Sequence, residues 1–234
     1  MDLSPEIARG RRSGPIPAEL VRQFAVLRDA SEEQLRVLAG VGRWDLYAPG
    51  ESIVRPGSGP DFVFIVVDGI VRVYGDPGAG HSATLFFRAH DDILDIGRLP
   101  DPLGEVLYAE AFSKQVLLCR FPWQVFHTTA LAHPPTAWAV LAQARSREQQ
   151  AACRLIECTC RDATTRTAHI LAEVHRTMPM QLAGMSQERL AEIIGISVTT
   201  TKRAVRTLER RHLVQHTAGK RGVEVLDDDT LANL

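Results

Sequence analysis

Apolar residues follow two different patterns along the first half of the chain. Between residues 17 and 40, leucine and phenylalanine recur at helical spacing, which predicts an amphipathic helix. Ser31 and Gln34 have the spacing of a capping box, so we expect a helix start there. Residues 41–125 instead contain short β-rich runs separated by glycine and proline turns. These runs are Ser52–Arg55, Phe62–Val67, Ile70–Tyr74, Ala83–Arg88 and Gln115–Phe121. Closely spaced strands of this kind predict an antiparallel sandwich or barrel.

A long segment without glycine or proline follows Pro134-Pro135, a pair that suits the start of a helix. If residues 134–160 are helical throughout, this helix is roughly 40 Å long. The apolar positions that fit one heptad seam are Trp138, Leu141, Ala152 and Leu155. Arg145 and Glu148 occupy the core positions between them, so the seam is imperfect. The segment is either a surface helix packed on its own domain or a dimerisation helix, and we favour the dimerisation helix.

The last third of the chain contains a helix signal, a break and a hairpin signal. Asp162 is placed to cap a helix, whose apolar face includes Ala168, Ile170, Leu171 and Val174. Residues 178–184 have the composition of a linker. Strand-like segments at 213–216 and 223–226 flank a loop with two glycines and two cations, which predicts a hairpin.

Two short helix signals joined by a tight turn lie between the linker and the hairpin. Ser186 is a good N-cap for residues 187–194, and Ser197 is a good N-cap for residues 198–211. Gly195 supplies the turn between them, which is the pattern of a helix-turn-helix. The residues expected in its small shared core are Leu190, Ile193, Ile194, Val205 and Leu208.

The start of the second helix carries hydroxyl and cationic side chains, the types that meet phosphates and base edges. The candidate DNA-binding residues are Ser197, Val198, Thr199, Thr200, Lys202, Arg203 and Arg206, with Lys220 and Arg221 at the hairpin tip. The first turns are where a recognition helix enters the major groove, and the hairpin would act as a wing. A helical pair with a solvated cationic face is the alternative, but it does not account for the glycine turn and the basic hairpin.

Charge is distributed unevenly, although the formal net charge of the chain is −1. Residues 161–222 contain 11 Lys/Arg and 5 Asp/Glu, whereas residues 1–160 contain 16 and 19. A basic block beside a mildly acidic one is expected where part of a chain meets a polyanion. No apolar run approaches the roughly 18 residues that span a bilayer, and no apolar stretch follows the N-terminal arginines. We therefore expect a cytoplasmic protein with a flexible leader at 1–16 and no membrane partner.

The order of elements resembles the cyclic-AMP receptor protein / fumarate-nitrate regulator (CRP/FNR) superfamily over about residues 17–226. The residues that carry the resemblance are Pro49-Gly50-Glu51, Phe64-Ile65, Asp68-Gly69-Ile70-Val71-Arg72-Val73, the helix after Pro134-Pro135, Asp162-Ala163-Thr164-Thr165-Arg166 and the helix-turn-helix. It implies an α+β fold with three parts. They are an antiparallel β-barrel of the cyclic-nucleotide-binding, double-stranded β-helix type at 17–133, a dimerisation helix at 134–160 and a winged helix-turn-helix at 161–234. The resemblance further implies a homodimer on a two-fold-symmetric site in double-stranded DNA, controlled by an effector in the N-terminal domain. RNA polymerase would be a partner if the protein is an activator.

Residues 91–106 depart from the nucleotide-binding pattern of that superfamily. Cyclic-nucleotide binders carry Gly-Glu and, about ten residues later, Arg-Ser, whose Arg neutralises the cyclic phosphate. Here Glu105 places a negative charge where that Arg is expected, and Ala151-Ala152 replaces the polar pair that meets adenine. Because a buried phosphate without its cation is costly, we expect that cyclic AMP is not the ligand. Arg98 is the candidate substitute cation.

The second helix of the helix-turn-helix also departs from the family pattern. Val198 replaces the first Arg of that pattern and Thr199 replaces a common Glu, while Arg203 retains the last Arg. Arg203 is therefore expected to keep a guanine contact, and the bases read by the first turn should differ.

Cysteines and histidines provide candidate cofactor sites. The N-terminal cysteine group of the family's iron–sulfur members is absent here, and the haem-binding Cys-x-His signature of its carbon-monoxide sensors is missing. The candidates are Cys153, Cys158 and Cys160 for a redox, metal or iron–sulfur site, and His81 and His90 for haem. We favour the alternative that these three cysteines are small apolar residues in a helix interface. Cys119, on a predicted strand, is expected in the core.

Three functions remain open at this point. The first, which we favour, is a DNA-binding transcription regulator that senses a gas, a redox change or a metabolite, or that needs no effector. The second is a barrel-type ligand- or protein-binding module with a non-functional DNA domain. The third is an enzyme, which we do not expect, because the sequence contains no glycine-rich phosphate loop, nucleophile elbow or His/Glu metal pair.

Overall fold

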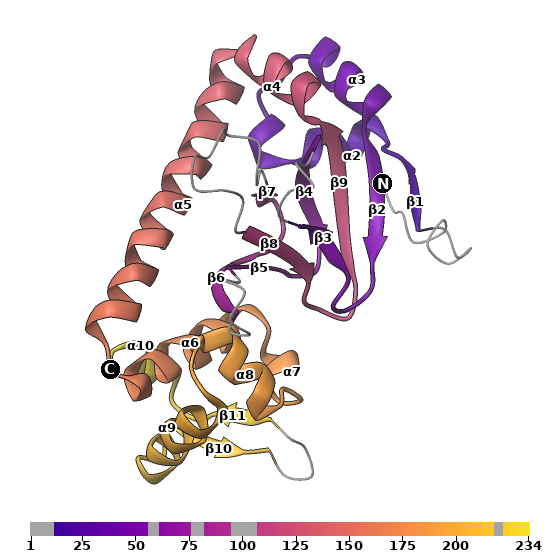
Figure 1. Cartoon of the computed structure of the whole chain (residues 1–234). Coiled ribbons are helices and arrows are strands. Elements are labelled where there is room, and N and C mark those ends of the chain that lie inside the picture. Colours follow the sequence, from indigo (N-terminus) through magenta and orange to yellow (C-terminus); the bar gives the residue numbers. More distant parts are fainter. Residues whose placement is uncertain (1–11, 56–60, 76–81, 95–106, 218–221) are drawn as a thin grey trace. The chain divides into compact units, whose positions relative to one another are not determined.

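The computed structural model describes residues 12–55, 61–75, 82–94, 107–217 and 222–234. The chain forms two compact units, which we describe one at a time (Figure 1). The N-terminal unit comprises Met1–Tyr74 and Phe86–Gln150, and the C-terminal unit comprises Gly75–Leu85 and Ala151–Leu234. Helix α5, Pro134–Cys160, contributes residues to both units and has the predicted bounds. None of the helices in the described part of the chain combines the length and the apolarity needed to cross a membrane.

Three short helical segments occupy the region that was expected to be helical over residues 17–40. They are α2 (Ala18–Gln23), η1 (Ala25–Leu27) and α3 (Glu32–Val41). The break comes at Phe24, whose backbone is extended (φ −67°, ψ 126°). The predicted capping box is confirmed, because Ser31 Oγ accepts from the N–H of Gln34 at 3.3 Å and Gln34 Oε1 accepts from the N–H of Ser31 at 2.8 Å.

Two sheets with antiparallel strand pairs form the N-terminal unit, apart from the strand residues within Gly75–Leu85, which belong to the C-terminal unit, and they confirm the predicted α+β class. The five-stranded sheet has the order β1 (Ser13–Pro15), β2 (Arg43–Tyr47), β9 (Val116–Pro122), β4 (Phe62–Asp68), β7 (Ile93–Leu94). The four-stranded sheet has the order β3 (Ser52–Val54), β8 (Leu107–Ala111), β5 (Val71–Gly75), β6 (Ala83–Arg88). One apolar core contains residues of both sheets, among them Val66 and Leu118 from the first and Val73 and Ala109 from the second.

A second core lies between the five-stranded sheet and the helices. Trp44 of β2 and Phe121 of β9 are fully buried there, together with Leu38 of α3 and Phe126 of α4 (Trp123–Leu131). Cys119 belongs to the same core, and its burial raises the pKa of its thiol. The predicted core position of Cys119 is thus confirmed.

Two segments differ from the sequence-based expectation. Residues 13–15 were expected in the flexible leader, but they form β1, which pairs with β2 through Gly14 opposite Trp44. The predicted linker at 178–184 contains a short helix, α7 (Pro179–Leu182). Pro179 suits a helix start because its missing N–H would be unpaired there anyway, and Leu182 is buried. Residues 1–11 of the leader lie outside the described part of the chain.

The C-terminal unit consists of short helices and one hairpin. They are α6 (Ala163–Thr177), α7, α8 (Gln187–Ile194), α9 (Val198–Arg210), β10 (Val214–His216), β11 (Val223–Val225) and α10 (Asp228–Ala232). The predicted apolar face of α6 is confirmed, since Ala168, Ile170, Leu171 and Val174 are all buried. The order of α8, α9 and the hairpin confirms the predicted winged helix-turn-helix architecture.

The turn between β4 and β5 generates a stability prediction. Gly69 has φ +86°, and a Cβ there would lie 2.3 Å from the carbonyl oxygen of Gln115. Gly69→Ala should therefore lower the free energy of unfolding by about 1–3 kcal/mol. Gly40→Ala is the matched control, because it lies in α3 with nothing within 4 Å of the new methyl group, and it should be neutral or stabilising. Equal effects of the two changes in urea titrations of the full chain would contradict this account.

Candidate nucleic-acid interface

The packing of α8 against α9 sets the position of the candidate DNA-binding residues. The predicted shared core is confirmed: the buried residues are Leu190, Ile193, Ile194, Val205 and Leu208. Gly195 ends α8 in the left-handed conformation (φ 74°, ψ 39°), which glycine adopts without steric cost. This residue turns the chain directly from the end of α8 into the cap of α9.

Serine side chains cap both helices, as the sequence predicts. Ser186 Oγ accepts from the N–H of Arg189 at 3.2 Å, and Ser197 Oγ accepts from the N–H of Thr200 at 3.2 Å. Ser197 Oγ also lies 2.8 Å from Thr200 Oγ1. The cap leaves further N–H groups at the start of α9, where the helix dipole favours an anion.

Helix α9 has one buried face and one polar face. Thr201, Ala204, Val205 and Leu208 are buried. The predicted DNA-binding residues of α9 are all exposed or half-buried: Ser197, Thr199, Lys202, Arg203 and Arg206 are exposed, and Val198 and Thr200 are half-buried. Within the described chain, Lys202, Arg203 and Arg206 make no side-chain hydrogen bond or ion pair, so their charges remain available to a ligand.

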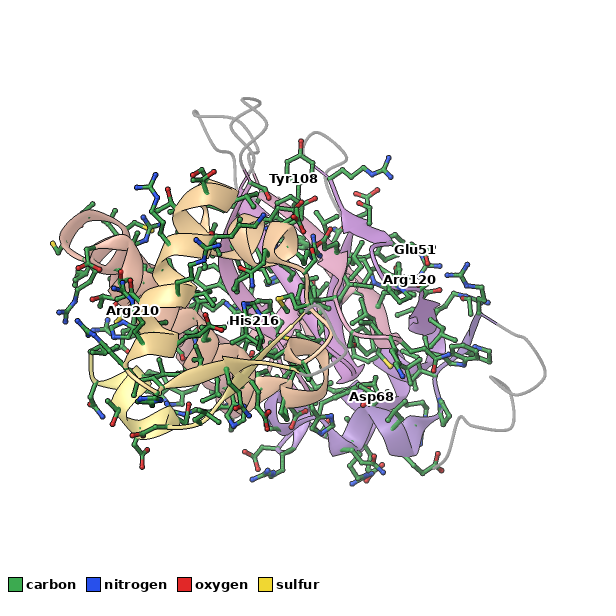
Figure 2. All side chains as sticks on the ribbon, turned by 90° about the horizontal axis from the view of Figure 1, so that it is seen from below. Glu51, Asp68, Tyr108, Arg120, Arg210 and His216 are labelled. Carbon is green, nitrogen blue, oxygen red and sulfur yellow. The ribbon has the colours of Figure 1, made fainter. Side chains whose placement is uncertain are left out.

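Arg210 extends this cationic face by one turn and was not among the predicted residues. Arg203, Arg206, Thr207, Glu209 and Arg210 line an open hollow of about 580 Å³. Arg210 donates to Thr207 Oγ1 at 3.1 Å and to the carbonyl oxygen of Arg206 at 3.4 Å. The spacing of 203, 206 and 210 places them on one helix face, a signal that the sequence contains. Figure 2 labels Arg210 together with His216 on the C-terminal unit.

The hairpin after α9 supplies the expected wing. Strands β10 and β11 are antiparallel, with Val214 opposite Val225 and His216 opposite Val223. His216 Nε2 lies 3.3 Å from Oε1 of Glu209, which links the hairpin to α9. Lys220 and Arg221, the predicted cations of the tip, lie outside the described residues.

Helix α5 presents apolar side chains to solvent. Trp138 is 72% exposed, Leu141 56% and Leu155 65%, and Ala152 is also exposed. Ile156, which the heptad pattern missed, is 54% exposed beside them. We call Trp138, Leu141, Ala152, Leu155 and Ile156 the apolar seam of α5.

The end of α5 is linked by polar contacts to the helix-turn-helix within the C-terminal unit. Asp162 caps α6 by accepting from the N–H of Thr165 at 2.8 Å. Arg166 of α6 donates to the carbonyl oxygen of Ile194 at 2.8 Å, at the end of α8. The same guanidinium group lies 3.7 Å from Sγ of Cys158.

The described candidate cofactor residues lie on α5 and in the N-terminal unit. Cys153, Cys158 and Cys160 are exposed, and no three His, Cys, Asp or Glu side chains of the described chain are grouped to hold a metal ion. His90 Nδ1 lies 2.8 Å from the carbonyl oxygen of Val67. His81, Arg98 and Glu105 lie outside the described residues, so the expectations placed on them remain predictions.

Comparison with known proteins finds a family match for the C-terminal part of the chain. Residues 165–234, which comprise most of α6 and everything after it, match the family model of the Crp-like helix-turn-helix domain. No curated protein matches the sequence.

Solved structures share the fold over most of the chain. FixK2 from Bradyrhizobium japonicum is 21% identical with a TM-score of 0.69, and the match covers 83% of this chain and 97% of that one. A crp/fnr-family protein from Eubacterium rectale is 17% identical with a TM-score of 0.76, over 90% and 99% of the two chains. The c-di-GMP-responsive regulator CLP of Xanthomonas campestris is 16% identical with a TM-score of 0.68, over 83% and 99%. The domain match and the shared fold confirm the predicted resemblance to the CRP/FNR superfamily.

The cap of α6 generates a prediction on acid stability. The bond from the N–H of Thr165 is the main reason that the pKa of Asp162 is lowered. A lowered folded-state pKa gives stability that is present above the ordinary aspartate pKa and is lost as pH falls through the lowered value, below about pH 4. Asp162→Asn keeps a neutral N-cap, so α6 should retain its amide protection at pH 7 and lose less of it in acid than the original chain. Hydrogen exchange of α6 peptides, corrected for intrinsic rates, measures this; an equal acid-induced loss in both proteins would contradict it.

Proposed function

We propose that this protein is a homodimeric transcription regulator that binds a two-fold-symmetric DNA site through the first turns of α9. The observation that carries the proposal is the exposed face of α9, where Lys202, Arg203 and Arg206 have no side-chain partner in the described chain beside a serine-capped helix start. The match of residues 165–234 to the Crp-like helix-turn-helix domain supports the same function. Cations and a helix N-terminus together suit phosphate and base-edge contacts.

The homodimer part of the proposal rests on the apolar seam of α5. Four large apolar side chains, each more than half exposed, follow one face of a 27-residue helix. A soluble helix that exposes such a stripe is stabilised by covering it, and a second copy offers the same stripe. A two-fold dimer then presents two α9 helices to two half-sites of a palindrome.

The sensed signal is proposed to be something other than cyclic AMP. A gas, a redox change or a metabolite acts on the N-terminal unit, or DNA binding is controlled by protein abundance alone. The Xanthomonas neighbour, described as c-di-GMP responsive, supports the view that this fold serves ligands other than cyclic AMP. If the protein is an activator, RNA polymerase is its further partner. Purification without air, followed by optical and metal analysis, separates the cofactor-based signals from the rest.

Selection from a randomised duplex pool tests the central proposal. The chain should enrich a palindrome with two half-sites about one helical turn apart. Arg203→Ala should cost about 1–3 kcal/mol of binding free energy and relax the preference for guanine at one position of each half-site. Arg36→Ala, on an exposed position of α3, serves as the control and should leave affinity unchanged. Failure to enrich any sequence would overturn the proposal.

The two serine caps provide a matched pair that separates stability from DNA contact. Ser186→Ala and Ser197→Ala remove equivalent cap bonds of 3.2 Å, so each should destabilise its helix by about 1 kcal/mol. Only Ser197→Ala, at the start of the recognition helix, should also weaken DNA binding at a temperature where both variants are folded. Titration of a fluorescent palindrome measures the difference, and equal affinities of the two variants would argue against a DNA contact at the start of α9.

A further inference from the structure

The charged residues of α5 separate into two groups according to whether their own chain pairs them. Three of the five are held internally. Arg147 donates to a backbone carbonyl of β7, Arg154 pairs with Glu173 at 2.6 Å, and Glu157 lies 2.8 Å from Nδ1 of His169. These three side chains lie on the face of α5 that packs on the rest of the chain.

Arg145 and Glu148 form the second group. Both are exposed, and neither makes a hydrogen bond or an ion pair with any residue that the structure describes. Seven residues separate Arg145 from Trp138 on one side and from Ala152 on the other, and Glu148 lies seven residues from Leu141 and from Leu155. Because seven residues are close to two helical turns, the unpaired charges lie within the apolar seam.

We propose that Arg145 of one chain pairs with the partner's Glu148, and Glu148 with the partner's Arg145, across a parallel pair of α5 helices. This inference rests on the proposed homodimer. The two ion pairs would select both the partner of α5 and the register in which the two helices align. Three residues correspond to a rise of about 4.5 Å, which an arginine and a glutamate side chain span together. The two-fold axis then creates two identical ion pairs.

The occupant of the seam is a second copy of this chain because the charges are self-complementary. Each seam contains one cation and one anion, so a symmetric pair satisfies all four charged groups. A shift of one helix by a heptad places Arg145 against Trp138 or Ala152 of the partner and leaves desolvated charges without partners, which is costly. Polar groups within an apolar seam specify register and partner in this way, whereas the apolar residues supply the association energy.

Charge exchange at the two positions tests the proposal in the full-length chain. Arg145→Glu and Glu148→Arg should each weaken the dimer at least about 10-fold, because all four charges at the interface then have the same sign. The double variant restores opposite charges and should return the dissociation constant to within about 3-fold of the original. An equimolar mixture of the two single variants should form mainly heterodimers. Sedimentation equilibrium gives the constants, and native mass spectrometry with one chain tagged gives the composition of the mixture.

Helix α3 offers a matched control for these substitutions. Glu33 and Arg36 are exposed, are also three residues apart and make no side-chain ion pair within the described chain. Glu33→Arg and Arg36→Glu therefore make the same charge changes. They should leave the dimer constant unchanged and give a statistical mixture. Suppose that the original chain is dimeric but the single variants have the same dissociation constant, or the double variant dimerises no more tightly than the single variants. Either result would overturn the ion pair and leave the proposed homodimer intact. An original chain that is monomeric at all concentrations would overturn both.

Discussion

The antiparallel pairing of β4 with β9 is the contact on which both cores of the N-terminal unit depend. Val63 and Ile65 of β4 belong to the core under the helices, while Phe64 and Val66 belong to the core between the two sheets. Strand β9 divides its residues between the same two cores. Because side chains alternate along a strand, a slip of one residue would exchange the two sets. The register of this one strand pair therefore determines what both the helices and the second sheet can pack against.

Helix α5 is held to the N-terminal unit by polar groups that bind backbone atoms. The side-chain amide of Gln143 accepts from the N–H of Ile93 and donates to the carbonyl oxygen of Asp91, each at 3.1 Å. Arg147 reaches the carbonyl oxygen of Ile93. This face of the helix thus pairs backbone N–H and C=O groups at the edge strand β7, and an apolar helix face would leave those groups without hydrogen bonds. Val140 packs against the core, whereas the tryptophan, leucine and isoleucine residues of the helix are on the seam and remain exposed.

The sequence predicted the helix caps and the bounds of α5 correctly, because these depend on residues close together in the chain. The serine and aspartate caps, Gly195 and the bounds of α5 could all be read from residue types at fixed spacing, because a cap needs only its own first turn. The strands β1, β2, β7 and β8 were missed because their identity comes from partners distant in sequence. Strand β7 has only two residues, and β1 contains glycine and proline, so neither has a hydrophobic period to detect.

The residues of the candidate site were also predicted in part from the sequence. The cationic face of α9 followed from helical spacing, and the same spacing would have added Arg210 had it been extended by one turn. Ile156 was missed because a strict heptad repeat places only Leu155 of this helical turn on the seam. A straight α-helix rotates slowly relative to that repeat, so both Leu155 and Ile156 are exposed. The pairing of Arg154 and Glu157 with α6 could not be predicted, because it depends on how the chain turns after α5.

The positions of the tryptophan and tyrosine residues determine which parts of this protein intrinsic fluorescence can follow. All three tryptophans and all three tyrosines precede residue 139, so the C-terminal unit contains neither. Trp44 is fully buried in the core of the N-terminal unit, whereas Trp138 lies 72% exposed on the seam of α5. Intrinsic fluorescence therefore follows the N-terminal unit and the covering of the seam, while melting of the helix-turn-helix leaves no direct tryptophan or tyrosine signal. An unfolding curve recorded by intrinsic fluorescence alone would therefore report on the N-terminal unit and on α5, and would miss unfolding of the C-terminal unit.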